Sequence, residues 1–133
     1  MNFYQQELFR IRREFFPDDD LINQIIQAKD FIENNYSKNI NLNDIAKEAF
    51  FSKYHFIRLF KSIYGQTPYQ YLTLVRIKNA KLLLKSGQTI TNTCFQVGFD
   101  SLSSFTGLFK KITGSTPSKF KKDKAICINN KKT

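Results

Sequence analysis

The chain lacks the features that mark a secreted or membrane-spanning protein. Only two of its 133 residues are cysteines, Cys94 and Cys127, too few for the disulfide framework of a small extracellular domain. Charged side chains interrupt the first sixteen residues, and no apolar run is long enough to span a bilayer. We therefore expect a cytoplasmic protein without membrane contact, in which Cys94 lies on a buried helix face.

Residue types that carry catalysis are also scarce. The chain has one histidine, His55, and contains neither an HExxH pair nor a glycine-rich phosphate loop. His55 stands next to the expected core residue Phe56, so we interpret it as a packing or phosphate-capping residue. The sequence predicts no enzymatic activity, no metal ion and no cofactor.

Acidic residues are missing from one long stretch of the chain. Residues 52–87 contain seven basic and no acidic side chains, in a chain whose formal net charge is +10. By contrast, residues 1–51 contain six basic and nine acidic side chains. A carboxylate-free block of this length suits a surface that faces phosphates, and the alternative is a solvated charge run without a ligand.

The apolar residues follow helical periodicity throughout, and the alternation typical of strands is absent. An amphipathic helix is expected over 3–16, ended by Pro17, and the acidic residues 18–20 offer an N-cap for a second helix that ends near residue 35. Further helices are expected over about 42–49, 53–64, 68–86 and 101–113. Residues 67–70 form a capping-box sequence, and Gly65 and Gly87 are helix stops.

The strongest pattern is an internal repeat. Residues 59–68 recur as residues 108–117, with seven of ten positions identical. Each copy consists of a short helix, a tight turn, a second helix and a glycine stop, which is the outline of a helix-turn-helix. The sequence thus predicts an all-α fold, with two helix-turn-helix subdomains joined by a long linker helix, plus an N-terminal amphipathic helix.

These elements divide the chain into three parts. We expect residues 1–20 to form an N-terminal extension and residues 21–122 to form a domain that binds DNA, because helix-turn-helix units commonly do so. Within that domain the helix-turn-helix units are expected at about 42–65 and 90–114, with the linker helix over 68–86. Residues 123–133 mix lysine and asparagine without periodicity, and we expect a basic disordered tail there.

Helix 53–64 carries two different stripes. The expected core stripe contains Phe56, Leu59, Phe60 and Ile63. The opposite stripe contains Tyr54, Ile57, Arg58 and Lys61. On that side Ile57 suits a thymine methyl group and Arg58 suits a bidentate pair with guanine, while Lys53 and Lys61 suit phosphates. The alternative is a basic amphipathic helix without a ligand.

Helix 101–113 repeats this arrangement with fewer long side chains. Its expected core stripe contains Phe105, Leu108, Phe109 and Ile112. Its outer stripe contains Leu102, Ser103, Thr106 and Lys110, with Gly107 at the place that matches Arg58. We therefore expect the first unit to discriminate between sequences and the second mostly to position the protein on DNA.

The linker helix is expected to be buried on two sides. One face carries Leu72, Val75, Leu82 and Leu83, and the other carries Ile77, Ala80 and Leu84. Its nineteen residues span roughly 28 Å, close to the roughly 34 Å between successive major grooves. Arg76 on this helix is a further candidate DNA contact.

Several stretches together resemble the AraC/XylS family of transcription regulators over about residues 21–122. They are residues 41–46, 52–61, 76–83, 97–101 and 105–117. The resemblance implies seven helices, a monomer that binds duplex DNA in adjacent major grooves, and contact with RNA polymerase. Two positions depart from the family pattern, because Phe50 replaces a usual turn glycine and Gly107 replaces a usual arginine.

A protein-interaction or dimerisation module without specific DNA readout is the competing hypothesis. Self-association through residues 3–16 would fit it. We expect this chain to lack the sensor domain that most members of the family carry. Under the favoured hypothesis of a DNA-binding regulator, the partner is double-stranded DNA and the protein acts at the nucleoid in the cytoplasm.

Overall fold

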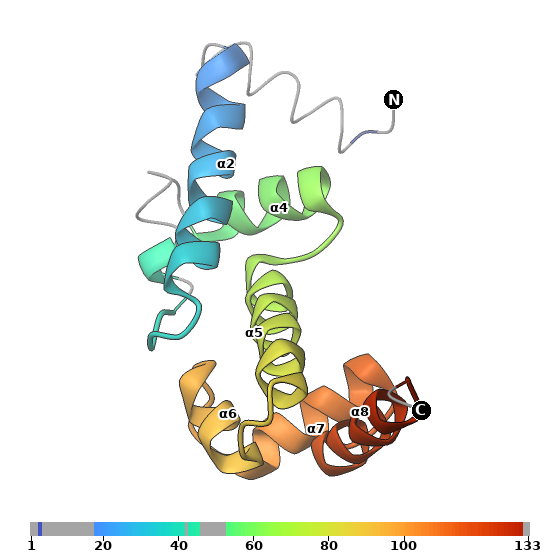
Figure 1. Ribbon diagram of the computed structural model, residues 1–133. Coiled ribbons are helices and arrows are strands. Elements are labelled where there is room, and N and C mark those ends of the chain that lie inside the picture. The colour runs from blue at the N-terminus through green and yellow to red at the C-terminus, as the bar shows by residue number, and fades with distance from the viewer. Residues whose placement is uncertain (1–2, 4–17, 42, 46–52, 132–133) are drawn as a thin grey trace. The chain divides into compact units, whose positions relative to one another are not determined.

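The computed structural model describes residue 3 and residues 18–41, 43–45 and 53–131. Its helices are α2 (Asp18–Asn35), α4 (Lys53–Tyr64), α5 (Pro68–Lys85), α6 (Ile90–Gln96), α7 (Leu102–Thr113) and α8 (Pro117–Lys131) (Figure 1). Residues 43–45 are also helical, and no strand occurs among the described residues. The expected all-α class is therefore confirmed. The expected helix over 3–16, the turn at Phe50 and most of the expected helix over 42–49 lie outside the described residues.

The chain divides into two compact units. Unit 1 comprises Met1–Asn35 and Ile40–Tyr71, and unit 2 comprises Tyr36–Asn39 and Leu72–Thr133. The division falls within α5, whose first residues belong to unit 1 and whose remainder belongs to unit 2. Each unit holds one of the two second helices of the repeat, α4 in unit 1 and α7 in unit 2.

Unit 1 is built around the packing of α2 against α4 (Figure 1). Its buried apolar side chains are Ile25, Ala28, Ile32, Ile45, Phe56, Leu59 and Phe60. Ile25, Ala28 and Ile32 follow one another at spacings of three and four residues, so they form one buried face of α2. Burial of these side chains stabilises the unit by about 1.5–3 kcal/mol for each large residue, before conformational entropy is subtracted.

The start of α5 is fixed to unit 1 by polar contacts. Thr67 and Gln70 form the expected capping box: the Gln70 amide donates to Thr67 Oγ1 at 3.1 Å, and the Thr67 amide donates to Gln70 Oε1 at 3.0 Å. The Tyr71 hydroxyl donates to Glu33 of α2, and the Tyr71 ring stacks on Tyr64. The beginning of the linker helix is thus anchored to both α2 and α4.

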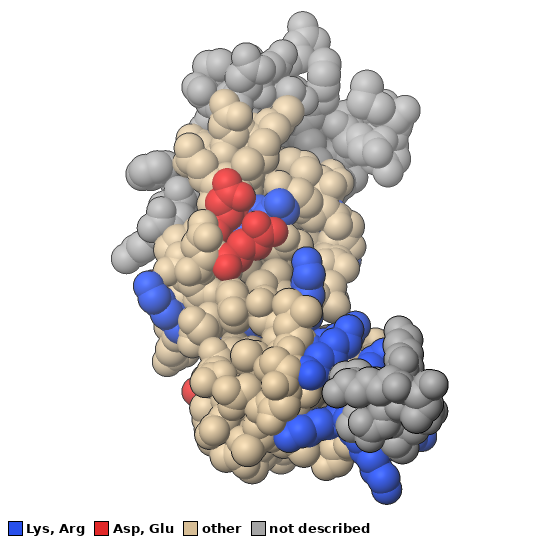
Figure 2. Space-filling view, in the orientation of Figure 1, with Lys and Arg blue, Asp and Glu red and all other residues tan. Residues whose placement is uncertain are grey.

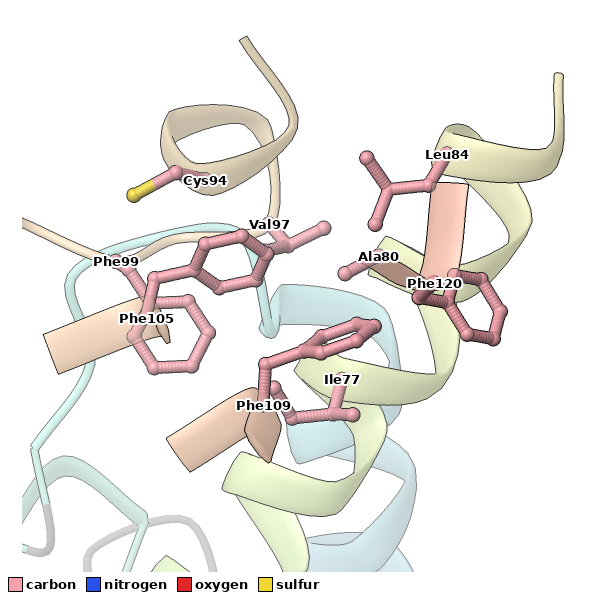
Figure 3. Close-up of a cluster of buried hydrophobic side chains, with 9 residues drawn as sticks. All are labelled: Ile77, Ala80, Leu84, Cys94, Val97, Phe99, Phe105, Phe109 and Phe120. Atoms are coloured by element: carbon pink, nitrogen blue, oxygen red, sulfur yellow. The ribbon is translucent and has the colours of Figure 1, made fainter. Parts of the chain in front are cut away.

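Unit 2 has a core dominated by aromatic rings (Figure 3). Phe99, Phe105, Phe109 and Phe120 form a chain of ring contacts with centroid distances of 5.3–5.6 Å. Aliphatic residues from α5 and α6 fill the rest of the core, and Cys94 is fully buried among them, as expected. The core joins α5, α6, α7 and α8 into one body.

The ends of α4 and α7 repeat each other as the sequence predicts. Both helices are followed by a glycine in the left-handed region, Gly65 with φ 76° and Gly114 with φ 90°. The amide of each glycine donates to a carbonyl four residues earlier, at 2.7 and 2.8 Å. Because L-residues with a side chain rarely adopt this backbone conformation, the glycines set where both helices stop.

The prediction of a core position is wrong for three residues. Ile63 of α4 is 46% exposed, its counterpart Ile112 of α7 is 40% exposed, and Leu82 of α5 is 56% exposed. Each helical residue turns by about 100°, so these side chains lie at the border of the buried face, where a neighbouring element is needed for cover. The periodicity of one helix does not reveal whether that cover exists.

Two helix ends also differ from expectation. The aspartates at 18–20 form the first turn of α2 instead of preceding it, a place where acidic residues interact favourably with the helix dipole. The tail expected to be disordered from residue 123 continues as helix to Lys131. This segment contains neither glycine nor proline, so nothing stops the helix that begins at Pro117.

Candidate nucleic-acid interface

The outer face of α4 presents large and charged side chains to solvent. Tyr54 is 78% exposed, and Arg58 and Lys61 are exposed one and two turns further along. Ile57 lies beside them and is half-buried. The backbone of Lys53 begins the helix, while its side chain lies outside the described part of the chain. The structure therefore brings together the residues of the expected stripe from Tyr54 to Lys61.

The outer face of α7 presents a smoother surface. Leu102, Ser103 and Lys110 are exposed, and Thr106 is half-buried. Gly107 lies at the centre of the exposed face, and a Cβ atom built there would meet no heavy atom within 4 Å. The side chain that Arg58 supplies on α4 is thus missing on α7, although the space for a Cβ atom is open.

Three exposed residues belong to these faces although the sequence stripes did not include them. They are Ser62 on α4, and Ser104 and Lys111 on α7. With about 100° per residue, Ser62 and Lys111 lie four positions after Arg58 and Gly107, on the same side of their helices. Extending each stripe by one turn finds these two residues, whereas Ser104 lies at its edge.

Both the start and the shape of α7 depend on the turn before it. Ser101 is the N-cap, and its Oγ accepts a hydrogen bond from the Ser104 amide at 3.2 Å. Ser101 Oγ also lies 3.5 Å from the Ser103 hydroxyl. The cap satisfies one of the free amides at the helix start. The position of Leu102 and Ser103 is therefore tied to the turn at residues 97–101.

Arg76 occupies a different place from the one expected. Its Nε donates to the Tyr36 carbonyl oxygen at 2.7 Å, and its Nη2 donates to the Lys38 carbonyl oxygen at 3.0 Å. Its guanidinium carbon also lies 5.6 Å from the centre of the Phe99 ring. The side chain is half-buried and engaged within unit 2, and this geometry argues for a structural role in place of a contact with DNA.

Charge is unevenly spread over the surface. Figure 2 shows acidic side chains gathered on α2, where Glu33 pairs with Lys29 at 3.3 Å. Among the described residues of unit 2, Asp100 and Asp123 are the only acidic ones, set against nine lysines on α5, α7 and α8 with described side chains. They are Lys78, Lys81, Lys85, Lys110, Lys111, Lys119, Lys121, Lys122 and Lys124.

The described residues show no sign of a reactive or metal-binding centre. No group of three or more histidine, cysteine or acidic residues among them is placed to hold a metal ion. Burial raises the pKa of the Cys94 thiol, and Asp100 adds to the rise, so this thiol stays protonated at neutral pH. Among the described helices, none combines the length and the apolar character needed to cross a membrane.

Comparison with known proteins agrees with this architecture. The family described as "Helix-turn-helix domain", of the AraC type, matches residues 45–123, more than half of the chain. The lactose operon transcription activator of Staphylococcus xylosus is 33% identical over 135 residues, which cover 96% of this chain and 48% of that protein. The HTH-type transcriptional regulator YbfI of Bacillus subtilis is 39% identical over 74 residues, or 56% of this chain and 27% of that protein. The chain thus spans about half or less of the length of these relatives.

Solved structures show the same fold. The C-terminal domain of AraT, a response regulator from Geobacillus stearothermophilus, has a TM-score of 0.72 at 25% identity, covering 75% of this chain and 84% of that one. The DNA-binding domain of AdpA, solved with a target DNA, also has a TM-score of 0.72, at 23% identity, covering 74% and 90%. The second likeness concerns the fold alone. With the repeated helix-turn-helix units and the matched segment taken together, the chain belongs to the AraC-type helix-turn-helix family of DNA-binding domains found in transcription regulators.

Proposed function

We propose that this chain binds specific sites in duplex DNA with both α4 and α7 in major grooves, and that α4 reads most of the sequence. The carboxylate-free block from 52 to 87 supports contact with phosphates. The length of α5, eighteen residues or roughly 27 Å, is compatible with recognition helices in successive grooves.

The observation that carries the proposal is the contrast between Arg58 and Gly107. The two residues occupy matching places in the repeat, and both lie on the exposed face of their helix. Arginine offers a planar set of donors that matches O6 and N7 of guanine. Glycine offers no side chain, so α7 lacks a long donor at the centre of its outer face.

The contacts expected of the remaining side chains follow from their length and polarity. On α4, the exposed ring of Tyr54 and the half-buried Ile57 suit apolar contacts with thymine methyl groups, and Lys61 suits a phosphate. On α7, Ser103 and Thr106 offer short hydroxyl groups, Leu102 an apolar contact and Lys110 a phosphate contact. We add Ser104 and Lys111 to the candidate DNA contacts and remove Arg76 from them.

The test is selection of bound sites from a random duplex library, followed by affinity measurements on the selected site and on a scrambled duplex. We expect Arg58→Ala to lose about 1–3 kcal/mol on the selected site and to relax the choice of base there. Lys61→Ala is the matched control, because loss of a phosphate contact weakens binding to both duplexes alike. Equal losses on both duplexes for Arg58→Ala would show that Arg58 is a phosphate contact.

An adaptor or dimerisation module is the competing function, and a salt titration separates the two. A DNA-binding domain binds random duplex at low salt and loses affinity as salt rises, whereas an adaptor shows no such binding. We further propose, from family membership, that the protein acts at the nucleoid in the cytoplasm, contacts RNA polymerase and has no enzymatic activity. Transcription in vitro from a promoter that carries the selected site tests the contact with polymerase.

A further inference from the structure

A short connection that follows α2 belongs to unit 2, although the residues on both sides of it in the sequence belong to unit 1. Residues Tyr36–Asn39 lie in unit 2, between Asn35 and Ile40 of unit 1. Tyr36 packs against the aromatic core of unit 2. The segment directly follows α2, which ends at Asn35. Its backbone carbonyls lie outside the helix and need hydrogen-bond partners from water or from the protein.

Arg76 supplies that partner. Two of its N–H groups reach two carbonyls of the connection, Nε the oxygen of Tyr36 at 2.7 Å and Nη2 the oxygen of Lys38 at 3.0 Å. The planar guanidinium holds these donors in a fixed fork, so both bonds form from one side-chain position. A lysine at this place has a single nitrogen on a flexible stem and does not reproduce the arrangement.

The Arg76 side chain lies in a socket between the connection at 36–39 on one side and the turn between α6 and α7, with Gly98 and Phe99, on the other. The Phe99 ring lies against the guanidinium, 5.6 Å from ring centre to Cζ. At Gly98 an added Cβ would lie 2.7 Å from the Tyr36 oxygen and 3.0 Å from Arg76 Nε. The contact with the backbone oxygen of Tyr36 is too short for carbon, so the turn approaches the Arg76–Tyr36 pair as closely as it does because residue 98 has no side chain.

We infer that Arg76 is a positioning residue for the second recognition helix: it sets the turn at 97–101 and, through the Ser101 cap, the start of α7. The cap bond from the Ser104 amide to Ser101 Oγ carries that position into the helix, and Leu102 and Ser103 lie directly behind the cap. This inference rests on the proposed function, in which α7 meets DNA.

The experiment measures binding of the whole chain to three duplexes at one salt concentration. One duplex carries the full selected site, one has the half bound by the first unit scrambled, and one has the half bound by the second unit scrambled. Footprinting with the Arg58→Ala variant identifies which half belongs to the first unit. The readout is the affinity ratio between the full site and each scrambled site, together with the dependence of affinity on salt.

Arg76→Ala and Gly98→Ala perturb the socket from opposite sides. We expect both variants to reduce discrimination at the second half by at least about fivefold and to leave discrimination at the first half unchanged. Gly98→Ala removes no charge, so its effect cannot come from a lost phosphate contact. Both changes act on the packing of Arg76 against the turn, and alanine at φ 103° also strains the turn itself, so the double variant should lose less than the sum of the two single losses. Lys78→Ala, an exposed neighbour on α5, is the control and should keep discrimination at both halves.

The outcomes separate the possibilities. If Arg76→Ala lowers the log–log salt slope by about 0.9 and weakens all three duplexes equally while Gly98→Ala binds normally, Arg76 is a phosphate contact and the inference is wrong. Equal loss of discrimination at both halves by folded protein also overturns it. Should the alanine variants fail to fold, Arg76→Lys decides: full binding means that charge alone matters, and selective loss at the second half supports the socket. If the unaltered chain binds no duplex, the proposed function fails instead.

Discussion

Gly107→Arg should install a second sequence reader on α7. Gly107 lies in the interior of the helix on its exposed face, and the space around its missing Cβ is open for 4 Å. The first side-chain atom of an arginine there meets no neighbouring heavy atom. Glycine in a helix interior costs about 1 kcal/mol relative to alanine, and arginine is close to alanine in helix propensity. The substitution should therefore stabilise unit 2 by about 1 kcal/mol, or about 4–8 °C in melting temperature for a domain of this size.

The effect on binding has a separate origin and a separate size. A bidentate arginine–guanine pair contributes about 1–3 kcal/mol of discrimination, which corresponds to about 5- to 150-fold in affinity. Gly107→Ala is the matched control, because it gains the same helix propensity but no donor. We expect both variants to melt at a higher temperature and only the arginine variant to acquire a new base preference.

The assay combines thermal melting followed by circular dichroism with a fresh site selection for each variant. The arginine variant should select sites with a guanine preference in the half bound by the second unit, which sites of the unaltered chain lack. If it selects the same sites with the same base frequencies, the exposed face of α7 does not face bases. A higher melting temperature with lost binding for both variants would show instead that DNA approaches the helix backbone too closely for any side chain at 107.

Other parts of the structure give further expectations. Six to eight phosphate contacts predict a log–log salt slope of roughly −5 to −7, and Lys61→Ala should reduce its magnitude by about 0.9. Deletion of residues 123–133 should weaken binding to the selected and random duplexes by the same factor, and a selective loss would assign this end of the chain to recognition. Tyr71→Phe removes the hydrogen bond to Glu33, so chemical denaturation should show a loss of about 1–2 kcal/mol. Burial and Glu33 raise the pKa of Tyr71 above its usual 10.0, so the folded state keeps this proton longer, and stability should fall above pH 10 less in Tyr71→Phe than in the unaltered chain.

The parts of the fold that rest on local rules could be predicted from the sequence. The capping box at 67–70 forms both of its hydrogen bonds, and the glycines after α4 and α7 adopt left-handed conformations. The phenylalanines of both repeat copies are fully buried at 56, 60, 105 and 109. The capping box and the glycine turns depend on neighbours within a few residues, and the buried phenylalanines recur at helical spacing, so both signals are visible in the sequence itself.

The features that the sequence did not reveal depend on partners distant in the chain. Arg76 is a basic residue in a basic block, and the carbonyls that engage it lie about forty positions earlier. A basic residue that binds DNA and one that binds backbone carbonyls have the same signature in the sequence. The prediction that the isoleucines at 63 and 112 belong to the core was wrong for a similar reason. The apolar stripe of each helix continues past the point where another element covers it.

The two copies of the repeat show why burial and recognition must be judged separately. Their inner faces are nearly the same, since Phe56, Leu59 and Phe60 match Phe105, Leu108 and Phe109 in place and largely in burial. Their outer faces differ at almost every position from 53 to 58 and 102 to 107. A side chain that packs a core is restrained by its neighbours, whereas an exposed side chain is free to change unless a ligand restrains it. The outer faces therefore hold the information that distinguishes the two units, and in α4 that information centres on Arg58, whereas in α7 the corresponding centre is empty.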